Sequence, residues 1–201
     1  MLNSVRLIDP RGDLDPCVPT GLRQSLKFWS QTAKPPILSG GSSLQRQMDK
    51  VIDEEQSLVL ATQIKSKARQ PFDNAYKAAL ATDGAVYVQG FLVISCQPYQ
   101  PIESAWIEVG DSILDPSLPF LNCKAEDLSY FAAQRLTVQQ LKAAIEDARE
   151  DYPEDDPLPI YGSAPYDYYG DVMLGGIAYT EAFSAAEQKC RELTQQDAEK
   201  N

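Results

Sequence analysis

Hydrophobic residues recur at helical spacing near the start of the chain. Leu22, Leu26 and Trp29 are four and three residues apart, a spacing that predicts a short amphipathic helix. After a stretch rich in proline and glycine, Ser42 or Ser43 can cap a second helix. The inner face of that second helix would consist of Leu44, Met48, Val51 and Ile52.

The pattern changes from helical to strand-like in the middle of the chain. Helical character continues through residues 57–70, and Pro71 then opens another helix that ends at Gly84. Residues 85–95 are nearly all apolar, as expected of a strand that is buried on both faces. Gly90 within this run predicts a bulge or a close approach of another backbone.

The second half of the chain combines a hairpin with two further helices. Residues 101–117 have the pattern of two short strands joined by a turn at residues 110–111. Thr137 and Gln140 match a capping box at the start of a helix, and a last helix begins near Thr180.

This order of helices, a buried strand, a hairpin and more helices predicts an α+β fold, with helices packed against a small antiparallel sheet. No repeat or low-complexity linker divides the chain, so residues 1–201 are expected to form a single domain. Within it, we expect a loop-rich arm at residues 1–20 and an acidic, tyrosine-rich loop region at residues 146–175.

Charge is distributed unevenly along the chain. The net charge is −11, with 11 basic and 8 acidic residues at positions 1–80 but 7 basic and 21 acidic residues at positions 81–201. An acidic C-terminal part would repel phosphates, so we expect no direct binding to nucleic acid. It would instead favour a partner protein with a basic surface patch.

Other features of the composition exclude several classes of protein. Hydrophobic residues make up 43% of the chain, enough for a sizeable core. The most apolar run is too short to span a bilayer, and the first residues do not resemble a secretory signal, so we expect no membrane association. Four scattered cysteines lack metal-ligand spacing, which favours free thiols, no cofactor, no metal and a cytoplasmic protein.

Four short sequences between residues 71 and 117 occur in a characteristic order. They are PFDNA at 71–75, YVQGF at 87–91, PIESAW at 101–106 and LDPS at 114–117. This order resembles the core of the transglutaminase-like group within the papain-like cysteine enzyme fold. In bacterial members of that group, a cysteine-aromatic-x-Asn-Ala sequence opens a helix, a strand follows, and a hairpin carries Pro-Ile-x-His-Ala-Trp and then Asp-Pro. The resemblance implies a family-like core at residues 71–117.

The resemblance also implies a catalytic triad, most of which is missing here. In the family, a thiolate at a helix N-terminus is stabilised by the helix dipole and a histidine, and a carboxylate orients that histidine. The matching positions in this chain are Pro71, Ser104 and Asp115, and the whole chain contains no histidine. Pro71 has no nucleophilic side chain, and Ser104 cannot titrate near neutral pH. The implied site is therefore degenerate, with only the orienting carboxylate left.

A rearranged active site is an alternative. Cys96 follows the predicted buried strand and is the first candidate for a substitute nucleophile, and Cys123 is the second. Either thiol could serve a cysteine-dependent amidase or acyltransferase. Both residues are also compatible with structural roles, as small apolar fillers or loop thiols, and Asp115 is also compatible with a turn before proline.

Two neighbouring segments in the C-terminal part provide a candidate binding surface. Between residues 146 and 156 the chain has seven carboxylates and one arginine, without the spacing of a calcium-binding loop. A tyrosine-rich loop follows, and exposed tyrosines suit protein–protein contacts, although they could instead close the core. The candidate binding residues are Glu150, Asp151, Asp155, Asp156, Tyr166, Asp167, Tyr168 and Tyr169.

These features leave three functions open. We expect a catalytically inactive transglutaminase-like domain that acts as a protein-binding or regulatory module. The first alternative is the cysteine-dependent enzyme with a rearranged site. The second alternative is an acidic mimic of a polyanion that binds a nucleic-acid-binding protein.

Overall fold

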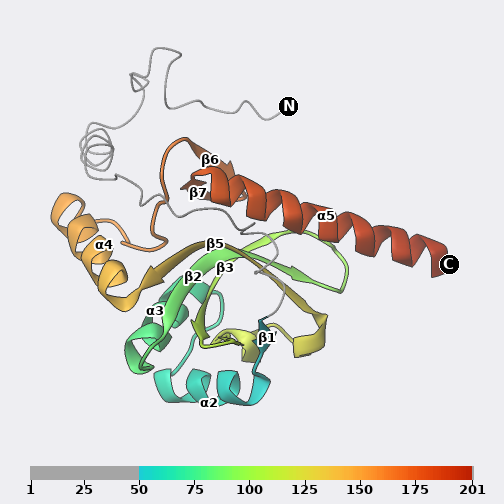
Figure 1. Ribbon diagram of the computed structural model, residues 1–201, viewed down its shortest axis with the longest axis horizontal. Coiled ribbons are helices and arrows are strands. Elements are labelled where there is room, and N and C mark those ends of the chain that lie inside the picture. The colour runs from blue at the N-terminus through green and yellow to red at the C-terminus, as the bar shows by residue number, and fades with distance from the viewer. Residues whose placement is uncertain (1–49, 201) are drawn as a thin grey trace, which may run out of the picture.

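The computed structural model describes residues 50–200 of the 201-residue chain and has an α+β architecture (Figure 1). Within the described residues, five strands form one sheet in the order β1-β4-β3-β2-β5. Neighbouring strands are antiparallel except β1 and β4, which run parallel. The sheet is therefore mixed, whereas the sequence predicted an antiparallel sheet. The strands are β1 (Val51–Ile52), β2 (Val86–Ile94), β3 (Ile102–Val109), β4 (Ser112–Leu114) and β5 (Leu128–Thr137).

The helices begin where the sequence supplies suitable residues. Asp53 accepts a hydrogen bond from the Gln56 backbone N–H at 2.9 Å before α2, and Pro71 occupies the first turn of α3. Thr137 and Gln140 form the predicted capping box of α4. The α-helices are α2 (Glu54–Ile64), α3 (Pro71–Ala81), α4 (Val138–Asp151) and α5 (Ile177–Lys200), and the short 3-10 turns η2 (Leu118–Phe120) and η3 (Ala125–Asp127) lie between β4 and β5.

The α-helices of the described residues pack against one face of the sheet. On strand β2 this face is formed by alternate residues, including Tyr87, Phe91 and Val93. Helices α2, α3 and α4 share an apolar cluster with Tyr87, whereas α5 shares a second cluster with Phe91 and Val93. Figure 1 shows α5 on one side of the coiled sheet and α2 and α3 near its other end.

The opposite face of the sheet, which we call the inner face, carries a third apolar cluster. Its buried members within the described residues each come from a different strand of the sheet: Val88, Trp106, Ile113 and Ala132. The Tyr130 ring of β5 packs edge-on against the Trp106 ring of β3, with ring centroids 4.9 Å apart, although β2 lies between the two strands. The sheet is therefore strongly coiled around its inner face.

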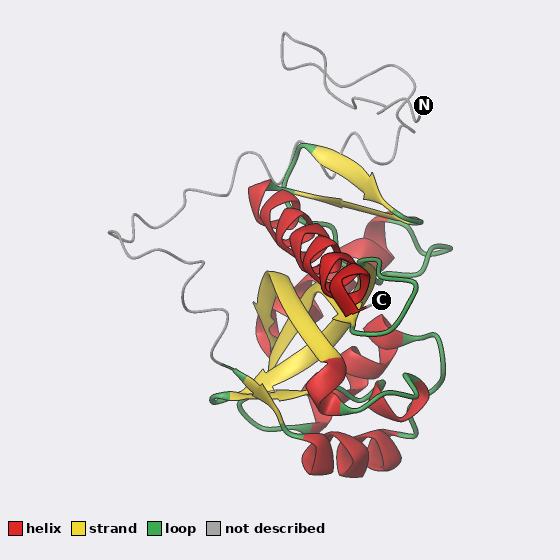
Figure 2. Ribbon diagram, turned by 90° about the vertical axis from the view of Figure 1, so that its right-hand side faces the viewer, coloured by secondary structure: helices red, strands yellow, loops and turns green. Residues whose placement is uncertain are grey.

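A separate two-stranded hairpin, β6 (Tyr166–Tyr169) and β7 (Val172–Gly175), precedes α5. Figure 2 shows it at one end of the molecule, beside α5. The loop before the hairpin is fixed to the sheet by the buried side chain of Gln89. Its Oε1 accepts from the Ile160 N–H at 2.8 Å, and its Nε2 donates to the Ile160 carbonyl at 3.0 Å. This pairing satisfies buried polar groups and positions the hairpin.

Several sequence predictions are confirmed, with small shifts at the ends. The helix opening at Pro71, the buried strand of residues 85–95 and the hairpin of residues 101–117 correspond to α3, β2 and the β3–β4 pair. The predicted irregularity at Gly90 is a register shift between β2 and β5. The sequence patterns did not indicate β5 or the β6–β7 hairpin.

One predicted element is wrong. The helix expected to include Val51 and Ile52 is absent at these residues, which form β1 and pair with β4. Asp53 then caps a new helix, and a capping residue has extended backbone geometry that interrupts a helix running through it. The spacing of two adjacent apolar residues suits either a helix face or a short strand, and pairing with β4 decides between them.

Some predictions lie outside the described residues. They concern the loop-rich arm at residues 1–20, the helix with Leu22, Leu26 and Trp29, the residues Leu44 and Met48, and the single-domain interpretation as it applies to residues 1–49. Within residues 50–200, no helix combines the length and the apolar character needed to cross a membrane.

Candidate functional site

Asp115 follows β4 directly and is completely buried. Its Oδ1 accepts a hydrogen bond from the Ser117 backbone N–H at 2.7 Å, and its Oδ2 accepts one from the Tyr130 hydroxyl at 2.9 Å. Burial raises the pKa of the Asp115 carboxyl to about 6, although both hydrogen bonds act to lower it. Above that pH the group is a buried carboxylate held by two neutral donors.

Tyr130 remains a hydrogen-bond donor over the physiological range. Burial raises the pKa of its phenol well above the usual value, and the neighbouring Asp115 carboxylate raises it further. Its ring contacts Trp106, whose Nε1–H is buried without a hydrogen-bond partner among residues 50–200. Among the described residues, the hydrogen-bond donors to the Asp115 carboxylate are therefore a backbone N–H and a phenol, and neither is a base near neutral pH.

Asn74 joins the first turn of α3 to the segment that follows Asp115. Its Nδ2 donates to the Ser117 Oγ at 3.2 Å and to the Lys67 carbonyl at 2.7 Å, and its Oδ1 accepts from the Lys67 N–H at 2.9 Å. These bonds fix the start of the helix that opens at Pro71 against the Asp115 segment. The motif at residues 71–75 includes Asn74, but sequence reasoning assigned it no role.

Ser104 lies in β3 opposite Gly90 of β2 and is 4% exposed. It is two residues from Trp106, so the two side chains belong to the same face of the sheet. The side-chain hydrogen bonds of the described residues do not link Ser104 to Asp115. The structure thus places the three family-matched positions at the start of α3, within β3 and after β4, without a hydrogen-bonded relay between them.

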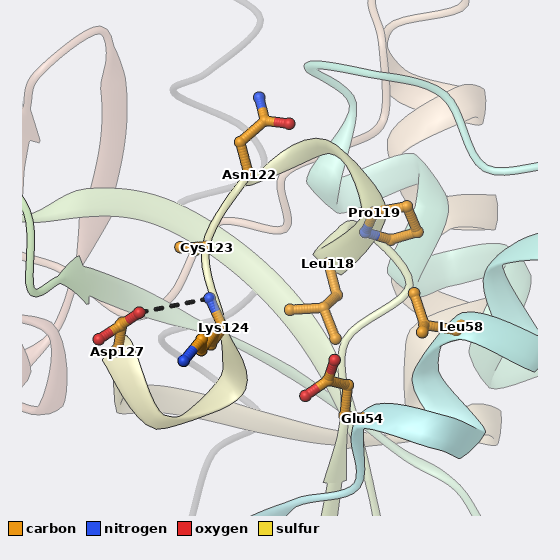
Figure 3. A pocket seen from close by; sticks show the side chains of 8 residues that line it. All are labelled: Glu54, Leu58, Leu118, Pro119, Asn122, Cys123, Lys124 and Asp127. Carbon is orange, nitrogen blue, oxygen red and sulfur yellow. Dashed lines mark hydrogen bonds between the residues drawn. The ribbon is translucent and has the colours of Figure 1, made fainter.

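Cys123 is a candidate thiol that lies close enough to Asp115 to interact with it electrostatically. It lines an open pocket of about 480 Å³ between α2 and the segment that leads into β5 (Figure 3). Burial raises the pKa of the Cys123 thiol, and the nearby Cys96, Asp127 and Asp115 raise it further. An activated nucleophile needs the opposite shift. The residues around the pocket are Glu54, Leu58, Leu118, Pro119, Asn122, Cys123, Lys124 and Asp127.

The other described cysteines also lack the environment of a nucleophile. Cys96 is exposed in the loop after β2, with no hydrogen bond to a base among the described residues. Cys190 is buried in α5, and burial and the nearby Glu187 raise the pKa of its thiol. The described residues contain no group of three or more cysteine, aspartate or glutamate side chains that could hold a metal ion.

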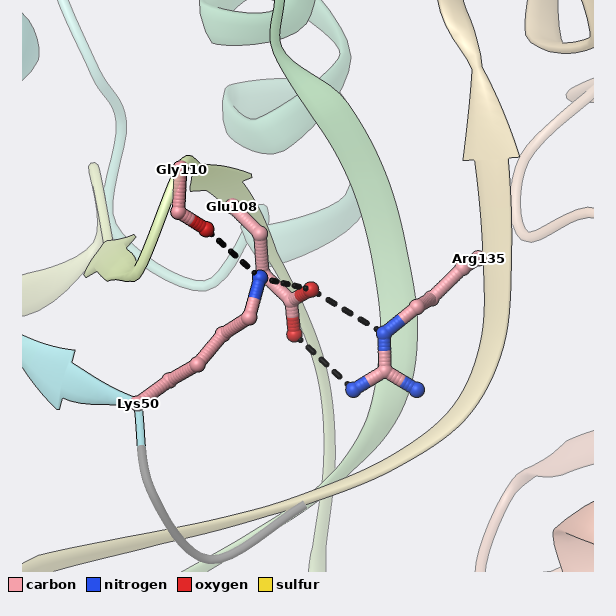
Figure 4. Close-up of polar contacts among 4 residues, drawn as sticks. All are labelled: Lys50, Glu108, Gly110 and Arg135. Atoms are coloured by element: carbon pink, nitrogen blue, oxygen red, sulfur yellow. Dashed lines mark hydrogen bonds and ion pairs between the residues drawn. The ribbon is translucent and has the colours of Figure 1, made fainter. Parts of the chain in front are cut away.

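A second buried carboxylate on the inner face was not identified from the sequence. Glu108 of β3 receives two hydrogen bonds from Arg135, both at 3.0 Å, and one from Lys50 at 2.9 Å (Figure 4). Burial would raise the pKa of Glu108, but the bonds from Arg135 and Lys50 outweigh it and the pKa lies below its usual value. The sequence signal for this ion pair was Arg135, a basic residue within the otherwise uncharged segment of residues 128–137.

The candidate binding residues differ in exposure. Glu150 and Asp151 end α4, Asp155 and Asp156 follow in the loop, and all four are exposed. In β6, Tyr168 is 63% exposed, whereas Tyr169 is buried against Phe91 and Tyr179. Asp167 is exposed and Tyr166 is half-buried. A partner could therefore reach Asp167 and Tyr168 but not the ring of Tyr169.

Comparison of the chain with protein-family models, with curated proteins and with solved structures gives no match. The function has therefore to be inferred from the residues of this chain and their geometry.

Proposed function

We propose that this chain is a catalytically inactive transglutaminase-like domain that acts as a protein-binding or regulatory module. The observation that carries the proposal is the hydrogen bonding of Asp115, whose two oxygens accept from Ser117 and Tyr130. In a cysteine–histidine site, this carboxylate would accept from the imidazole and hold it in orientation. Here a tyrosine hydroxyl occupies that acceptor, and the chain has no histidine.

The order of elements supports the resemblance on which the proposal rests. Helix α3 opens at Pro71, β2 and the β3–β4 hairpin follow, and Asn74 ties the start of the helix to the Asp115 segment. With proline and serine at the nucleophile and base positions, the inherited reaction would lose orders of magnitude in rate. We infer that a domain with this core but without the reactive groups functions by binding a partner.

The acidic segment at the end of α4 is the surface best suited to a partner. Seven carboxylates and one arginine lie between residues 146 and 156. A partner with a basic patch would be attracted electrostatically, which speeds association more than it tightens the complex. The same charges would repel nucleic acid.

A charge-reversal experiment tests this function. The full chain with Glu150, Asp151, Asp155 and Asp156 all changed to lysine is compared with a control in which Glu55, Asp83, Asp111 and Glu192 are changed to lysine. Each variant replaces four carboxylates by four lysines, so the two have the same net charge, and all eight positions are exposed. Cross-linking in extracts of the source cells, read by mass spectrometry, should lose its specific products with the first variant only. Equal cross-linking by both variants and the unmodified chain would exclude this surface.

Salt separates the module from a polyanion mimic. The mimic would bind mainly through charge, so its complex would dissociate as salt is raised to about 1 M, where the Debye length falls to roughly 3 Å. A binding module with aromatic contacts should keep a measurable part of its complex under the same conditions.

A further inference from the structure

The outer face of the β6–β7 hairpin presents aromatic side chains to solvent. Tyr168 pairs with Met173 and Tyr166 with Gly175, and side chains alternate between the two faces of such a ladder. The alternate residues Tyr169 and Leu174 are buried against α5 and β2. We call Tyr161, Tyr166, Tyr168 and Met173 the tyrosine patch.

Two members of the tyrosine patch, Tyr161 and Tyr166, are held in place by each other and by the backbone. The Tyr161 and Tyr166 rings meet edge to face with centroids 6.0 Å apart, and the Tyr166 hydroxyl donates to the Gly162 carbonyl at 3.0 Å. Gly162 lies so close to β7 that an added Cβ would come within 2.2 Å of the Gly175 carbonyl oxygen. A rigid aromatic surface loses little side-chain entropy when it binds.

Two acidic residues, Asp155 and Asp167, lie near the tyrosine patch in the chain. Asp155 is exposed in the loop six residues before Tyr161, and its carboxylate is near enough to the Tyr161 phenol to act with burial and Tyr168 in raising the pKa of that phenol. Asp167 is exposed and accepts a hydrogen bond from the Tyr168 backbone N–H at 2.9 Å, but in the ladder it belongs to the opposite face, with Tyr169 and Leu174. Tyr161 and Tyr168 are 49% and 63% exposed, so their rings are accessible to a partner.

We propose that the tyrosine patch, with Asp155 at its edge, binds an arginine side chain presented by a basic segment of a partner protein. A guanidinium stacks on tyrosine rings and at the same time pairs with a carboxylate, which an ammonium does less well. Anionic ligands would be repelled by the Asp155 carboxylate and by the negative charge of the acidic segment that contains it. This assignment rests on the proposed binding function, and it names the contact that gives the acidic surface its specificity.

A binding assay with short peptides tests the assignment. The probe is a fluorescently labelled tetra-arginine peptide, and tetra-citrulline has nearly the same shape without the charge. Tyr168→Ala in the full chain should weaken tetra-arginine binding roughly two- to fivefold, the range of an exposed cation–π contact. Asp155→Asn should weaken it by about twofold. Phe120→Ala and Asp83→Asn, at exposed sites outside the patch, are the controls and should leave it unchanged.

Three results would overturn the assignment. The first is equal binding by Tyr168→Ala and Phe120→Ala, which would leave only the net negative charge as the cause. The second is equal binding of tetra-citrulline and tetra-arginine. The third is self-association of the chain that Tyr168→Ala abolishes while tetra-arginine binding stays the same, which would make a second copy the occupant.

The assignment and the proposed function can fail separately. The inactive-domain proposal is tested by the reactivity of the cysteine thiols towards iodoacetamide. If no thiol is unusually reactive and tetra-arginine binding is independent of Tyr168, the binding module remains and the tyrosine patch is excluded. If a thiol is reactive, the inactive-domain proposal fails, while the peptide assay still decides on the patch.

Discussion

The Tyr130 hydroxyl donates to the Asp115 carboxylate at 2.9 Å, although β3 and β2 lie between β5 and β4. In a flat sheet, strands three positions apart would be separated by roughly 14 Å. The bond therefore depends on strong coiling of the sheet, and it stabilises that coiling in return. The Glu108–Arg135 ion pair is a second link of this kind, from β3 to β5 across β2.

Asp115→Asn should change how stability depends on pH. The pKa of Asp115 is about 6 in the folded chain, above its ordinary value of 3.8, so ionisation opposes folding. The penalty is absent below pH 4, grows between pH 4 and 6, and reaches about 3 kcal/mol above that range. The difference in unfolding free energy between the variant and the unmodified chain is measured in urea at pH 4 and pH 7.5. It should shift in favour of the variant by up to this amount between the two pH values.

A matched control for this prediction is Asp83→Asn at an exposed position. Its unfolding free energy should follow that of the unmodified chain at both pH values. The interpretation of Asp115 would be contradicted if the unfolding free energy of Asp115→Asn also changed with pH in the same way as that of the unmodified chain.

Tyr130→Phe should destabilise the fold by about 1–3 kcal/mol at pH 7.5, because one oxygen of a buried carboxylate loses its donor. The loss should be smaller at pH 4, where Asp115 is protonated. Tyr168→Phe removes a hydroxyl from an exposed ring and should stay within about 0.5 kcal/mol. Equal effects of the two variants would show that the Tyr130 hydrogen bond contributes nothing to the coiled sheet.

Glu108→Gln should have the opposite pH dependence. The pKa of Glu108 lies below its usual value, so its stabilising effect is present near neutral pH and is lost as pH falls. The substitution leaves Arg135 and Lys50, both partly exposed, without their charged partner, which should cost about 1–3 kcal/mol at pH 7. Chemical denaturation should show this cost shrinking towards pH 3.

Glu126→Gln is the control for Glu108→Gln. Glu126 pairs with Lys124 at the surface, with both side chains more than 70% exposed. Surface pairs of this kind contribute little, so the control should be close to neutral. A loss as large as that of Glu108→Gln would contradict the role assigned to the buried pair.

The sequence was informative where local rules decide the structure. Pro71 at a helix start, Thr137 with Gln140 in a capping box and the apolar run of β2 each act within a few residues. The strand β5 was missed because the bulge opposite Gly90 breaks its alternation of apolar and polar residues. The β6–β7 hairpin was missed because Tyr168 and Tyr169 are equally aromatic but face opposite ways.

The candidate site was predictable only as positions. Pro71, Ser104 and Asp115 could be named from motif order, and the structure locates each in its expected element or segment. The partners of Asp115 could not be named, because Tyr130 reaches it across two strands and that distance depends on the coiling of the whole sheet. The partners of Glu108 could not be named either, because Lys50 and Arg135 come from opposite edges of the sheet.

The central claim, an inactive core, is tested most directly by the reactivity of its thiols. The folded full chain is treated with limiting iodoacetamide from pH 5 to pH 9, with glutathione as the reference, and each cysteine is quantified by mass spectrometry. We predict that no thiol reacts faster than glutathione at any pH and that Cys123 and Cys190 react more slowly, because their pKa values are raised. Rapid alkylation of one thiol at pH 5 to 6 would contradict the claim and identify a nucleophile.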